Sequence, residues 1–500
     1  MSTDSNMKRT KVICTLGPAT DADGVLKSMI ESGMDVARFN FSHGLHDEHE
    51  HRLTCLKEAR DEACVPVATI LDTKGPSIRI GKIKKGQASL SKGANLTLVE
   101  EQIEGDDKKI HQNCKGLCEY VVPGTVILID DGLIELSVEE VKGTDICCIV
   151  QNSGILHEGK QVNLPGTEVP LPFITDKDRA DLLFGIKHEM DFVAASFVSC
   201  ADDVRIMRDF LIENGGSSIR IIAKIENASA VKNIDEILDA SDAIMIARGD
   251  LGVEVPFTEV PHIQKQIIKK CNEAYKPAII ATQMLESMIV NARPTRAEVT
   301  DVANAIYEGA DTIMLSGETA VGSHPVAAVQ TMTQIAQETE PHIYQDGSIP
   351  NRANNTCAVS AVIGKAATSA AETLGAKCII VPTITGRSAR LISNFRPNVP
   401  ICAVTTTEKT CRSLQLNWGV TPIIGNVVGE SSFILEQACN ECERHGFVQK
   451  DDICVLTLGD RHTSPSTTKR FLASLDPNAP EPCPTNVVEI IQIGVERNFS

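Results

Sequence analysis

Short apolar runs rich in β-branched residues recur along the first two thirds of the chain, and nearly all are followed by a stretch with helical spacing of its apolar positions. A repeated strand-then-helix pattern is typical of a parallel sheet. The runs span residues 11–18, 36–44, 67–75, 191–198, 219–227, 243–250, 277–284 and 311–319. These eight units predict a (β/α)₈ TIM barrel, an α/β fold whose chemistry lies at the carboxyl ends of the strands.

Between the third and fourth predicted strands, the pattern changes to short alternating runs punctuated by glycine. Residues 80–169 form a segment too long for an ordinary βα loop. Its alternation of apolar and polar positions predicts a small all-β domain inserted over the barrel mouth. A domain in that position could act as a lid.

A polar stretch near residue 345 ends the barrel pattern, and alternation of strands and helices resumes beyond it. A chain of 500 residues is long enough for several cores, because single cores stop growing near ~250–300 residues. The predicted domains are residues 1–79 (barrel, first part, with a short N-terminal arm), 80–169 (inserted β lid), 170–345 (barrel, second part) and 346–500 (C-terminal α/β domain).

Composition narrows the class of protein. The chain has 48 Lys and Arg against 66 Asp and Glu, a net charge of −18 that argues against nucleic acid and anionic membranes as partners. No apolar run approaches the ~20 residues of a membrane span, and the N-terminus lacks the apolar core of a signal peptide. The 17 cysteines are scattered through predicted strands and helices, which fits a reducing compartment. We therefore expect a cytoplasmic protein.

Charged residues follow the fifth and sixth predicted strands. Lys224 and Glu226 are two residues apart, so they share one face of a strand. Asp250 at the next strand end can join Glu226 in binding one hard cation, and two carboxylates with open positions suit Mg²⁺ or Mn²⁺ better than zinc. Backbone N–H groups around Gly249 can hold a carboxylate or phosphate. The structural alternative is a salt bridge between the lysine and the two acids.

Other strand ends carry hydroxyls, amides and cations suited to hydrogen bonding, proton relay or anion binding. The seventh and eighth predicted strands end with Thr282, Ser316, Glu318 and Thr319. On the second strand, Arg38, Asn40 and Ser42 share one face, and the two neighbouring phenylalanines lie on the other. His43 follows in a loop, where a lone histidine is more often a surface residue than a general base.

Three motifs favour a structural interpretation. In "RPTRAEV", Thr295 and Glu298 form a capping box that opens a helix. The apolar face expected of that helix comprises Val299, Val302, Ala303 and Ile306. "GILHEGKQ" (154–161) nearly matches a P-loop, but Gln161 replaces the required hydroxyl and no helix follows. "CNEC" (439–442) has no second cysteine pair at zinc spacing, so ordinary helix thiols are expected.

The motifs taken together resemble pyruvate kinase. They occur in the order "ICTLGPAT", "VARFNFSHG", "LDTKGPSIR", "AKIEN", "MIARGDLGVE", "ATQMLESM", "RPTRAEVTDVANAI" and "IMLSGETA", and the likeness runs from about residue 10 to 430. The resemblance implies barrel, lid and C-terminal regulatory domain, a homotetramer, and transfer of the phosphoryl group of phosphoenolpyruvate to ADP, which yields pyruvate and ATP.

The resemblance also implies roles for the strand-end residues. Glu226 and Asp250 would bind Mg²⁺, and Lys224 would stabilise the phosphoryl group and the enolate. The substrate carboxylate would lie at Gly249, Asp250 and Thr282. The implied proton relay comprises Thr282, Ser316 and Glu318. The implied cationic clamp on the phosphates comprises Arg38, Arg79 and Lys160, with Asn40 and His43 beside the nucleotide.

Potassium is the second cofactor that the resemblance implies. Its ligands would be Asn40, Ser42, Asp72 and the Thr73 carbonyl. Ser77 stands where potassium-dependent relatives carry Glu and potassium-independent ones carry Lys, and Ile80 replaces a family Thr. We expect the K⁺ site to persist, with weaker or less selective activation.

"TITGRSA" resembles the loop that holds a phosphorylated allosteric effector in many pyruvate kinases. The effector residues that it implies are Thr383, Thr385, Gly386, Arg387 and Ser388. Unregulated members also carry this loop, and residues 460–486 form a longer stretch than in most relatives. Two other functions stay open: a magnesium-dependent barrel aldolase or lyase, which needs no ADP clamp, and an inactive binding protein, which would lack Lys224 or a metal carboxylate.

Overall fold

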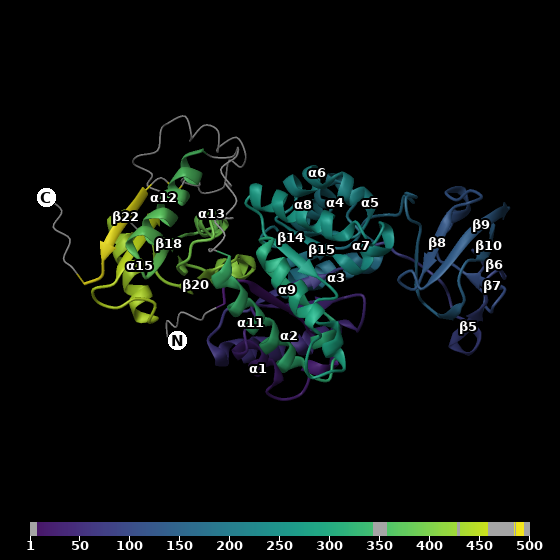
Figure 1. Ribbon diagram of the computed structural model, residues 1–500, viewed down its shortest axis with the longest axis horizontal. Coiled ribbons are helices and arrows are strands. Elements are labelled where there is room, and N and C mark those ends of the chain that lie inside the picture. The colour runs from purple at the N-terminus through teal and green to yellow at the C-terminus, as the bar shows by residue number, and fades with distance from the viewer. Residues whose placement is uncertain (1–7, 344–357, 428–430, 459–484, 486, 495–500) are drawn as a thin grey trace.

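The computed structural model describes residues 8–343, 358–427, 431–458, 485 and 487–494. The chain forms three parts in a row, with a barrel in the middle, a small β domain at one end and an α/β domain at the other (Figure 1). The stretch 460–486 singled out in the sequence lies outside the described residues, except for Thr485.

Eight parallel strands close the barrel in the order β1-β17-β16-β15-β14-β13-β3-β2. They are β1 (Lys11–Thr15), β2 (Val36–Asn40), β3 (Ala68–Asp72), β13 (Phe192–Ala195), β14 (Arg220–Ile225), β15 (Ala243–Ala247), β16 (Ala278–Ala281) and β17 (Thr312–Leu315). Each lies within one of the eight predicted runs, so the TIM-barrel prediction is confirmed. Every strand is buried over most of its length because side chains fill the barrel on one face and meet the outer helices on the other.

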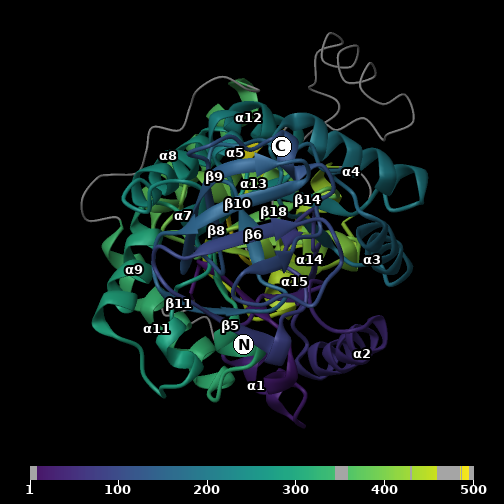
Figure 2. The same cartoon turned by 90° about the vertical axis from the view of Figure 1, so that its right-hand side faces the viewer.

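The outer ring of helices covers the barrel (Figure 2). It comprises α1 (Val25–Glu31), α2 (His46–Ala63), α3 (Asp176–Lys187), α4 (Ala201–Glu213), α5 (Ala228–Lys232), α6 (Ile234–Ala240), α7 (Arg248–Glu254), α8 (Val260–Glu273), α9 (Arg296–Tyr307), α10 (Gly317–Ala320) and α11 (Pro325–Thr339). The predicted capping box opens α9: the Thr295 hydroxyl accepts from the Glu298 amide. Val302 and Ile306 are buried, but Val299 is 36% exposed, so the predicted apolar face of α9 is narrower than expected.

The inserted β domain has a core of its own around Leu96, Leu98 and Ile127. Its strands are β4 (Ile78–Arg79), β5 (Gln87–Leu90), β6 (Asn95–Val99), β7 (Lys109–His111), β8 (Val126–Ile129), β9 (Ile134–Lys142), β10 (Asp145–Val150), β11 (Gly154–His157) and β12 (Gln161–Asn163). The P-loop-like segment becomes β11, a turn and β12, with no helix.

The C-terminal domain is a five-stranded sheet in the order β20-β19-β18-β21-β22 with only β22 antiparallel. Its elements are α12 (Ala358–Leu374), β18 (Cys378–Pro382), α13 (Arg387–Asn394), β19 (Ile401–Thr405), α14 (Glu408–Ser413), β20 (Val420–Ile424), α15 (Ser431–Arg444), β21 (Ile453–Leu458) and β22 (Val487–Gln492). "CNEC" lies on α15, and all cysteines among the described residues are free thiols. No described helix is long and apolar enough to span a bilayer.

The C-terminal domain packs against the amino-terminal ends of the barrel strands. Arg412 pairs with Asp191 at 2.9 Å, directly before β13, and Arg396 pairs with Asp311 at 2.8 Å, directly before β17. Leu416 joins the side chains that fill the barrel interior. The carboxyl ends of the strands are therefore left to face the inserted β domain.

Candidate active site

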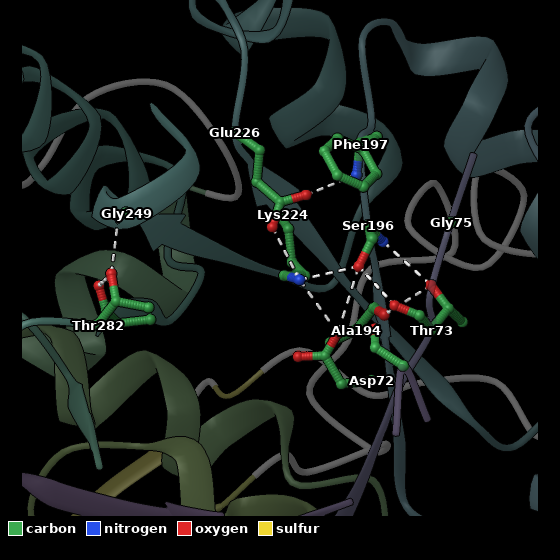
Figure 3. A network of polar contacts seen from close by, with 12 residues as sticks. Asp72, Thr73, Gly75, Ala194, Ser196, Phe197, Lys224, Glu226, Gly249 and Thr282 are labelled. Atoms are coloured by element: carbon green, nitrogen blue, oxygen red, sulfur yellow. Dashed lines mark hydrogen bonds and ion pairs between the residues drawn. The ribbon is translucent and has the colours of Figure 1, made fainter. Parts of the chain in front are cut away.

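The Lys224 ammonium is the centre of a polar network at the carboxyl ends of the barrel strands (Figure 3). Its Nζ lies 2.8 Å from Glu226 Oε1 and 3.1 Å from Asp72 Oδ1. It also donates to Ser196 Oγ at 2.8 Å. The three partners follow from neighbouring strand ends, because β14, β13 and β3 are consecutive in the barrel. A cation held by three oxygens in a buried site has a defined position and a high local field.

Burial and opposite charges act against each other on this cation. Burial alone would lower the pKa of Lys224, but Asp72 and Glu226 outweigh it and raise the pKa above its ordinary value. Burial alone would likewise raise the pKa of Asp72, whereas Arg38 and Lys224 hold it below its ordinary value. Lys224 is thus an ammonium and Asp72 a carboxylate at neutral pH.

Glu226 and Asp250 form the pair of carboxylates predicted to bind a divalent cation. Burial and the neighbouring Asp250 raise the pKa of Glu226 to about 7, although Lys224 opposes the shift. Burial also raises the pKa of Asp250, with a contribution from Asp131 of the inserted domain. Two buried carboxylates that resist ionisation together are stabilised by a cation between them, and oxygen donors fit Mg²⁺ or Mn²⁺. Across the described ranges, no group of three or more His, Cys, Asp or Glu could hold a metal ion.

Ser196 and Phe197 belong to the network although the sequence reasoning missed them. Ser196 Oγ donates to the Thr73 carbonyl at 2.7 Å and accepts from Lys224. The Phe197 amide donates to Glu226 Oε2 at 2.7 Å, and its φ of 57° turns the backbone toward that carboxylate. One signal was available: the fourth predicted strand, "DFVAASFV", contributed no candidate, and Ser196 is the hydroxyl at its carboxyl end.

The residues predicted to bind potassium lie together where β2 and β3 end. Asn40 is the register partner of Asp72, and Asn40 Oδ1 accepts from the Ser42 amide at 3.1 Å. The Asp72 carboxylate is also bound by Arg38, whose Nε lies 2.6 Å from Oδ2. The Thr73 carbonyl accepts from Ser196. These oxygens fit a monovalent cation by donor type, and Asp72 divides its charge between this group and the Lys224 network.

Thr282 is the first residue after β16, and its hydroxyl accepts from the Gly249 amide at 2.8 Å. The structure therefore brings together two groups predicted to hold a carboxylate (Figure 3). Glu318 is 2% exposed, and its oxygens accept from the Ser316 amide at 2.7 Å and the Leu285 amide at 3.1 Å. Burial raises the pKa of Glu318, although these amides oppose the shift.

Arg79 ends β4, and Lys160 directly precedes the adjoining strand β12, at the base of the inserted domain. Arg79 pairs in register with Gln161, and its guanidinium donates to the Gly159 carbonyl at 3.0 Å. Arg79 Nε also donates to Ser77 Oγ at 3.1 Å. Lys160 pairs with Asp130 at 2.8 Å and is 42% exposed, so it is accessible to an anion from solvent.

His43 lies close to Arg79 and Arg38. Burial lowers the pKa of its imidazole, and the charges of Arg79 and Arg38 lower it further. His43 is therefore neutral at pH 7 and can act as a hydrogen-bonding group beside an anion rather than as a cation. The charges of Arg79 and Arg38 thus act on this imidazole, and the nucleotide clamp stays a prediction.

The predicted effector loop lies far from this site, before and within the first turn of α13. Gly386, with φ of 78°, caps α13, and its amide donates to Thr383 Oγ1 at 3.0 Å. Ser388 shares a 2.7 Å hydrogen bond with Thr485. Arg220 of the barrel donates to the Thr385 carbonyl at 3.2 Å, so this loop contacts the barrel. Arg387 is exposed on the first turn.

The chain is similar to known proteins over most of its length. The family model for the pyruvate kinase barrel domain matches residues 7–329, and the model for the pyruvate kinase alpha/beta domain matches residues 361–470. A pyruvate kinase of Clostridium acetobutylicum is 47% identical over 91% of this chain and 96% of its own length. One of Geobacillus stearothermophilus is 45% identical over 90% of this chain and 78% of its own. A crystal structure of a Cryptosporidium parvum pyruvate kinase superposes with a TM-score of 0.89 at 37% identity, covering 98% of this chain and 97% of that one.

Proposed function

Because this chain belongs to the pyruvate kinase family and transfers the phosphoryl group of phosphoenolpyruvate to ADP, we propose that the residues at the strand ends divide that reaction among them. Membership of this family argues against the two alternatives, a magnesium-dependent barrel aldolase or lyase and an inactive binding protein. Phosphoryl transfer requires mainly alignment and charge neutralisation. The network around Lys224 supplies both, and it is the observation that carries this proposal.

Lys224 is the group that neutralises charge on the reacting atoms. Its ammonium is held by Asp72, Ser196 and Glu226, so it needs no reorganisation when negative charge develops near it. Arg38 is fixed in the same network through Asp72 and contributes a second cation to the phosphoryl group. Both cations are anchored by residues on neighbouring strands, which keeps them close to the position that the phosphate takes.

Glu226 and Asp250 are the residues that would hold Mg²⁺ or Mn²⁺. When bound, the ion supplies positive charge toward the phosphate and the enolate oxygen. The chain prepares this site by placing the two carboxylates in a buried environment that raises the pKa of each, and Asp250 adds to the shift of Glu226.

The second half of the reaction turns enolpyruvate into pyruvate by protonation at carbon. We assign the proton relay to the Thr282 hydroxyl, with Ser316 and Glu318 behind it. Thr282 Oγ1 donates to the Ala281 carbonyl at 2.6 Å and accepts from Gly249, so its hydroxyl orientation is defined. Substrate carboxylate binding is assigned to Gly249, Asp250 and Thr282.

The nucleotide is assigned to the gap between barrel and lid. Arg79 and Lys160 would bind the phosphates of ADP or ATP, with Asn40 and His43 beside them. Arg79 is held by Ser77 and by the Gly159 carbonyl, which places its charge at the base of the lid. A lid that carries part of the clamp lets nucleotide binding favour closure over the site.

The proposal also includes a K⁺ site, an effector site and assembly into a tetramer. The K⁺ ligands are Asn40, Ser42, Asp72 and Thr73, with activation weakened by Ser77. The effector phosphate is assigned to the loop that comprises Thr383, Thr385, Gly386, Arg387 and Ser388. We assign the protein to the cytoplasm as a homotetramer.

The direct test is a coupled assay for pyruvate with purified protein, phosphoenolpyruvate, ADP and Mg²⁺. The expected result is equal amounts of pyruvate and ATP, with no pyruvate when ADP is omitted or when EDTA removes the metal. Pyruvate formed without ATP would indicate a phosphatase and would contradict the proposed reaction at this site.

A further inference from the structure

The backbone that carries Thr282 has an unfavourable conformation. Thr282 has φ of 69° and Gln283 has φ of 55°, so two consecutive residues directly after β16 are left-handed. This region is disfavoured for residues with a Cβ, and most of all for a β-branched residue such as threonine. Backbone of this kind persists only where surrounding contacts hold it in place.

Arg248 makes those contacts. Its Nη2 donates to the Thr282 carbonyl at 2.7 Å, and its Nε donates to the same oxygen at 3.2 Å. Nη2 also donates to the Gln283 carbonyl at 3.1 Å. One guanidinium therefore binds the carbonyls of both left-handed residues, using the fork of donors that only arginine has.

The guanidinium is itself fixed on its other side. Arg248 Nη1 lies 2.8 Å from Asp301 on α9, and the Arg248 side chain is only 9% exposed. Asp301 thus balances the charge and orients the plane of the guanidinium toward β16. The contacts from Asp301 through Arg248 to Thr282 join two consecutive units of the barrel, β15 with α7 and β16 with α9.

Arg248 also begins α7, the helix that carries Asp250 in its first turn. Its neighbour Gly249 donates its amide to the Thr282 hydroxyl. Main chain and side chain of the 248–249 segment therefore bind opposite ends of Thr282, the hydroxyl and the carbonyl. This arrangement defines the position of the hydroxyl relative to the carboxylate of Asp250.

We propose that Arg248 is a positioning residue that holds Thr282 in its left-handed conformation and so places the Thr282 hydroxyl for its step of the reaction. Asp301 in turn holds the Arg248 guanidinium in place through their ion pair. This inference rests on the proposed role of Thr282, and it concerns the geometry of that residue rather than direct contact between Arg248 and substrate.

The test is a double-mutant cycle with Arg248→Lys and Thr282→Ala, because lysine keeps the charge but not the fork. Misplacement of a reacting group by about 1 Å costs roughly 10²-fold. Arg248→Lys should therefore lower kcat by about 10- to 100-fold, with the KM for ADP unchanged. In the Thr282→Ala background, the same substitution should lower kcat by less than about threefold, because the hydroxyl it positions is gone.

A second measurement separates positioning from general destabilisation. Exchange of the methyl protons of pyruvate for deuterium, followed by NMR in the presence of Mg²⁺ and ATP, reports the proton step alone. Arg248→Lys should slow this exchange in proportion to kcat. Asp301→Asn should have the same effect to a smaller degree, and it serves in place of Arg248→Lys if that variant does not fold. Arg205→Lys is the matched control, because Arg205 pairs with Asp202 on the exposed face of α4.

The results that would overturn the role of Thr282 can be told apart from those that would overturn the role of Arg248. If Thr282→Ala keeps full activity, the proposed role of Thr282 fails, and this inference fails with it. If Thr282→Ala loses activity but Arg248→Lys does not, only the inference is wrong. If Arg248→Lys lowers kcat equally in both backgrounds, or if Arg205→Lys has the same effect, Arg248 acts by another route and the inference is also overturned.

Discussion

Lys224 Nζ lies 2.8 Å from Glu226 Oε1, and the two residues are separated by a single position at the end of β14. A strand places residues two apart on one face, so this ion pair is a local consequence of the sequence. Its surroundings are not local: Asp72 and Ser196 come from other strands of the barrel. The four side chains bind one another before any substrate enters.

Replacement of Lys224 by methionine should abolish turnover. The substitution keeps the length of the side chain but removes the charge that neutralises the phosphoryl group, and loss of such a group typically costs about 10²–10³-fold or more in kcat. Asp72 and Glu226 also lose their shared partner, so the melting temperature should fall while the protein remains folded and binds Mg²⁺. The coupled assay, circular dichroism and calorimetric titration with Mg²⁺ measure these effects.

Lys232→Met is the matched control for this prediction, because Lys232 is an exposed lysine on α5. It should leave both kcat and the melting temperature unchanged. Retention of activity by the folded Lys224→Met variant would show that the catalytic charge is supplied elsewhere.

The affinity for Mg²⁺ should depend on pH through Glu226. Burial and Asp250 raise the pKa of Glu226 to about 7, so below that pH the metal must displace a proton. The apparent Kd for Mg²⁺ should therefore rise by up to about tenfold per pH unit below pH 7 and level off above it. Calorimetry in buffers of different ionisation enthalpy would show about one proton released per metal at pH 6.

The raised pKa of Glu226 also predicts how the stability of the metal-free protein depends on pH. Between pH 4.5 and 7 the folded protein holds a proton on Glu226 that the unfolded chain has lost. The free energy of unfolding should therefore decrease as pH rises across this window, and Mg²⁺ should restore it above pH 7. A Mg²⁺ affinity that stays constant from pH 6 to pH 8 would contradict the predicted role of Glu226.

Potassium should activate the enzyme weakly. The predicted K⁺ ligands are present, but Ser77 supplies neither the carboxylate of potassium-dependent relatives nor an internal ammonium. Ser77 accepts a hydrogen bond from Arg79 instead. We expect K⁺ to raise kcat only a few-fold over sodium-free buffer that holds a large organic cation, with little selectivity for K⁺ over Na⁺.

Ser77→Glu should increase the dependence on K⁺, because a carboxylate beside Arg79 adds negative charge near the cation ligands. Ser91→Glu adds the same charge at an exposed position of the lid and should change nothing. Full activity of the parent enzyme without any monovalent cation would remove the basis for this prediction.

A phosphorylated effector should stabilise the C-terminal domain. Binding to the native state alone raises the free energy of unfolding by RT ln(1 + [L]/Kd), about 2.7 kcal/mol at a hundredfold excess over Kd. A thermal-shift screen with sugar bisphosphates and AMP should therefore raise the melting temperature for at least one compound. Ser388→Ala should reduce that shift, since it removes a hydroxyl at the first turn of α13.

Ser360→Ala, a substitution on α12 of the same domain, is the control and should keep the shift. If none of the compounds shifts the melting temperature, the loop does not bind a phosphate effector of these classes. In that case its hydroxyls serve the structure alone, as in the hydrogen bond between Ser388 and Thr485.

Periodicity along the chain was sufficient to predict the barrel. Strands such as β14 and β16 are marked by short apolar runs, and the polar residue after each run lies at the strand end where a parallel barrel gathers its chemistry. The capping box at Thr295 was readable for the same reason, since a helix start depends on residues within one turn. Local patterns therefore identified Lys224, Glu226 and Thr282 as candidates.

The order of elements and the chemistry at each strand end thus follow from the sequence alone, because both depend on neighbours in the chain. Barrel closure alone decided which of these ends meet: it joined Ser196 to Lys224 and placed Asp72 between two cations. It also brought Arg248 to the left-handed backbone of Thr282, and no spacing predicts such a contact. Distances between side chains on different strands are set by packing, and packing is a property of the whole fold.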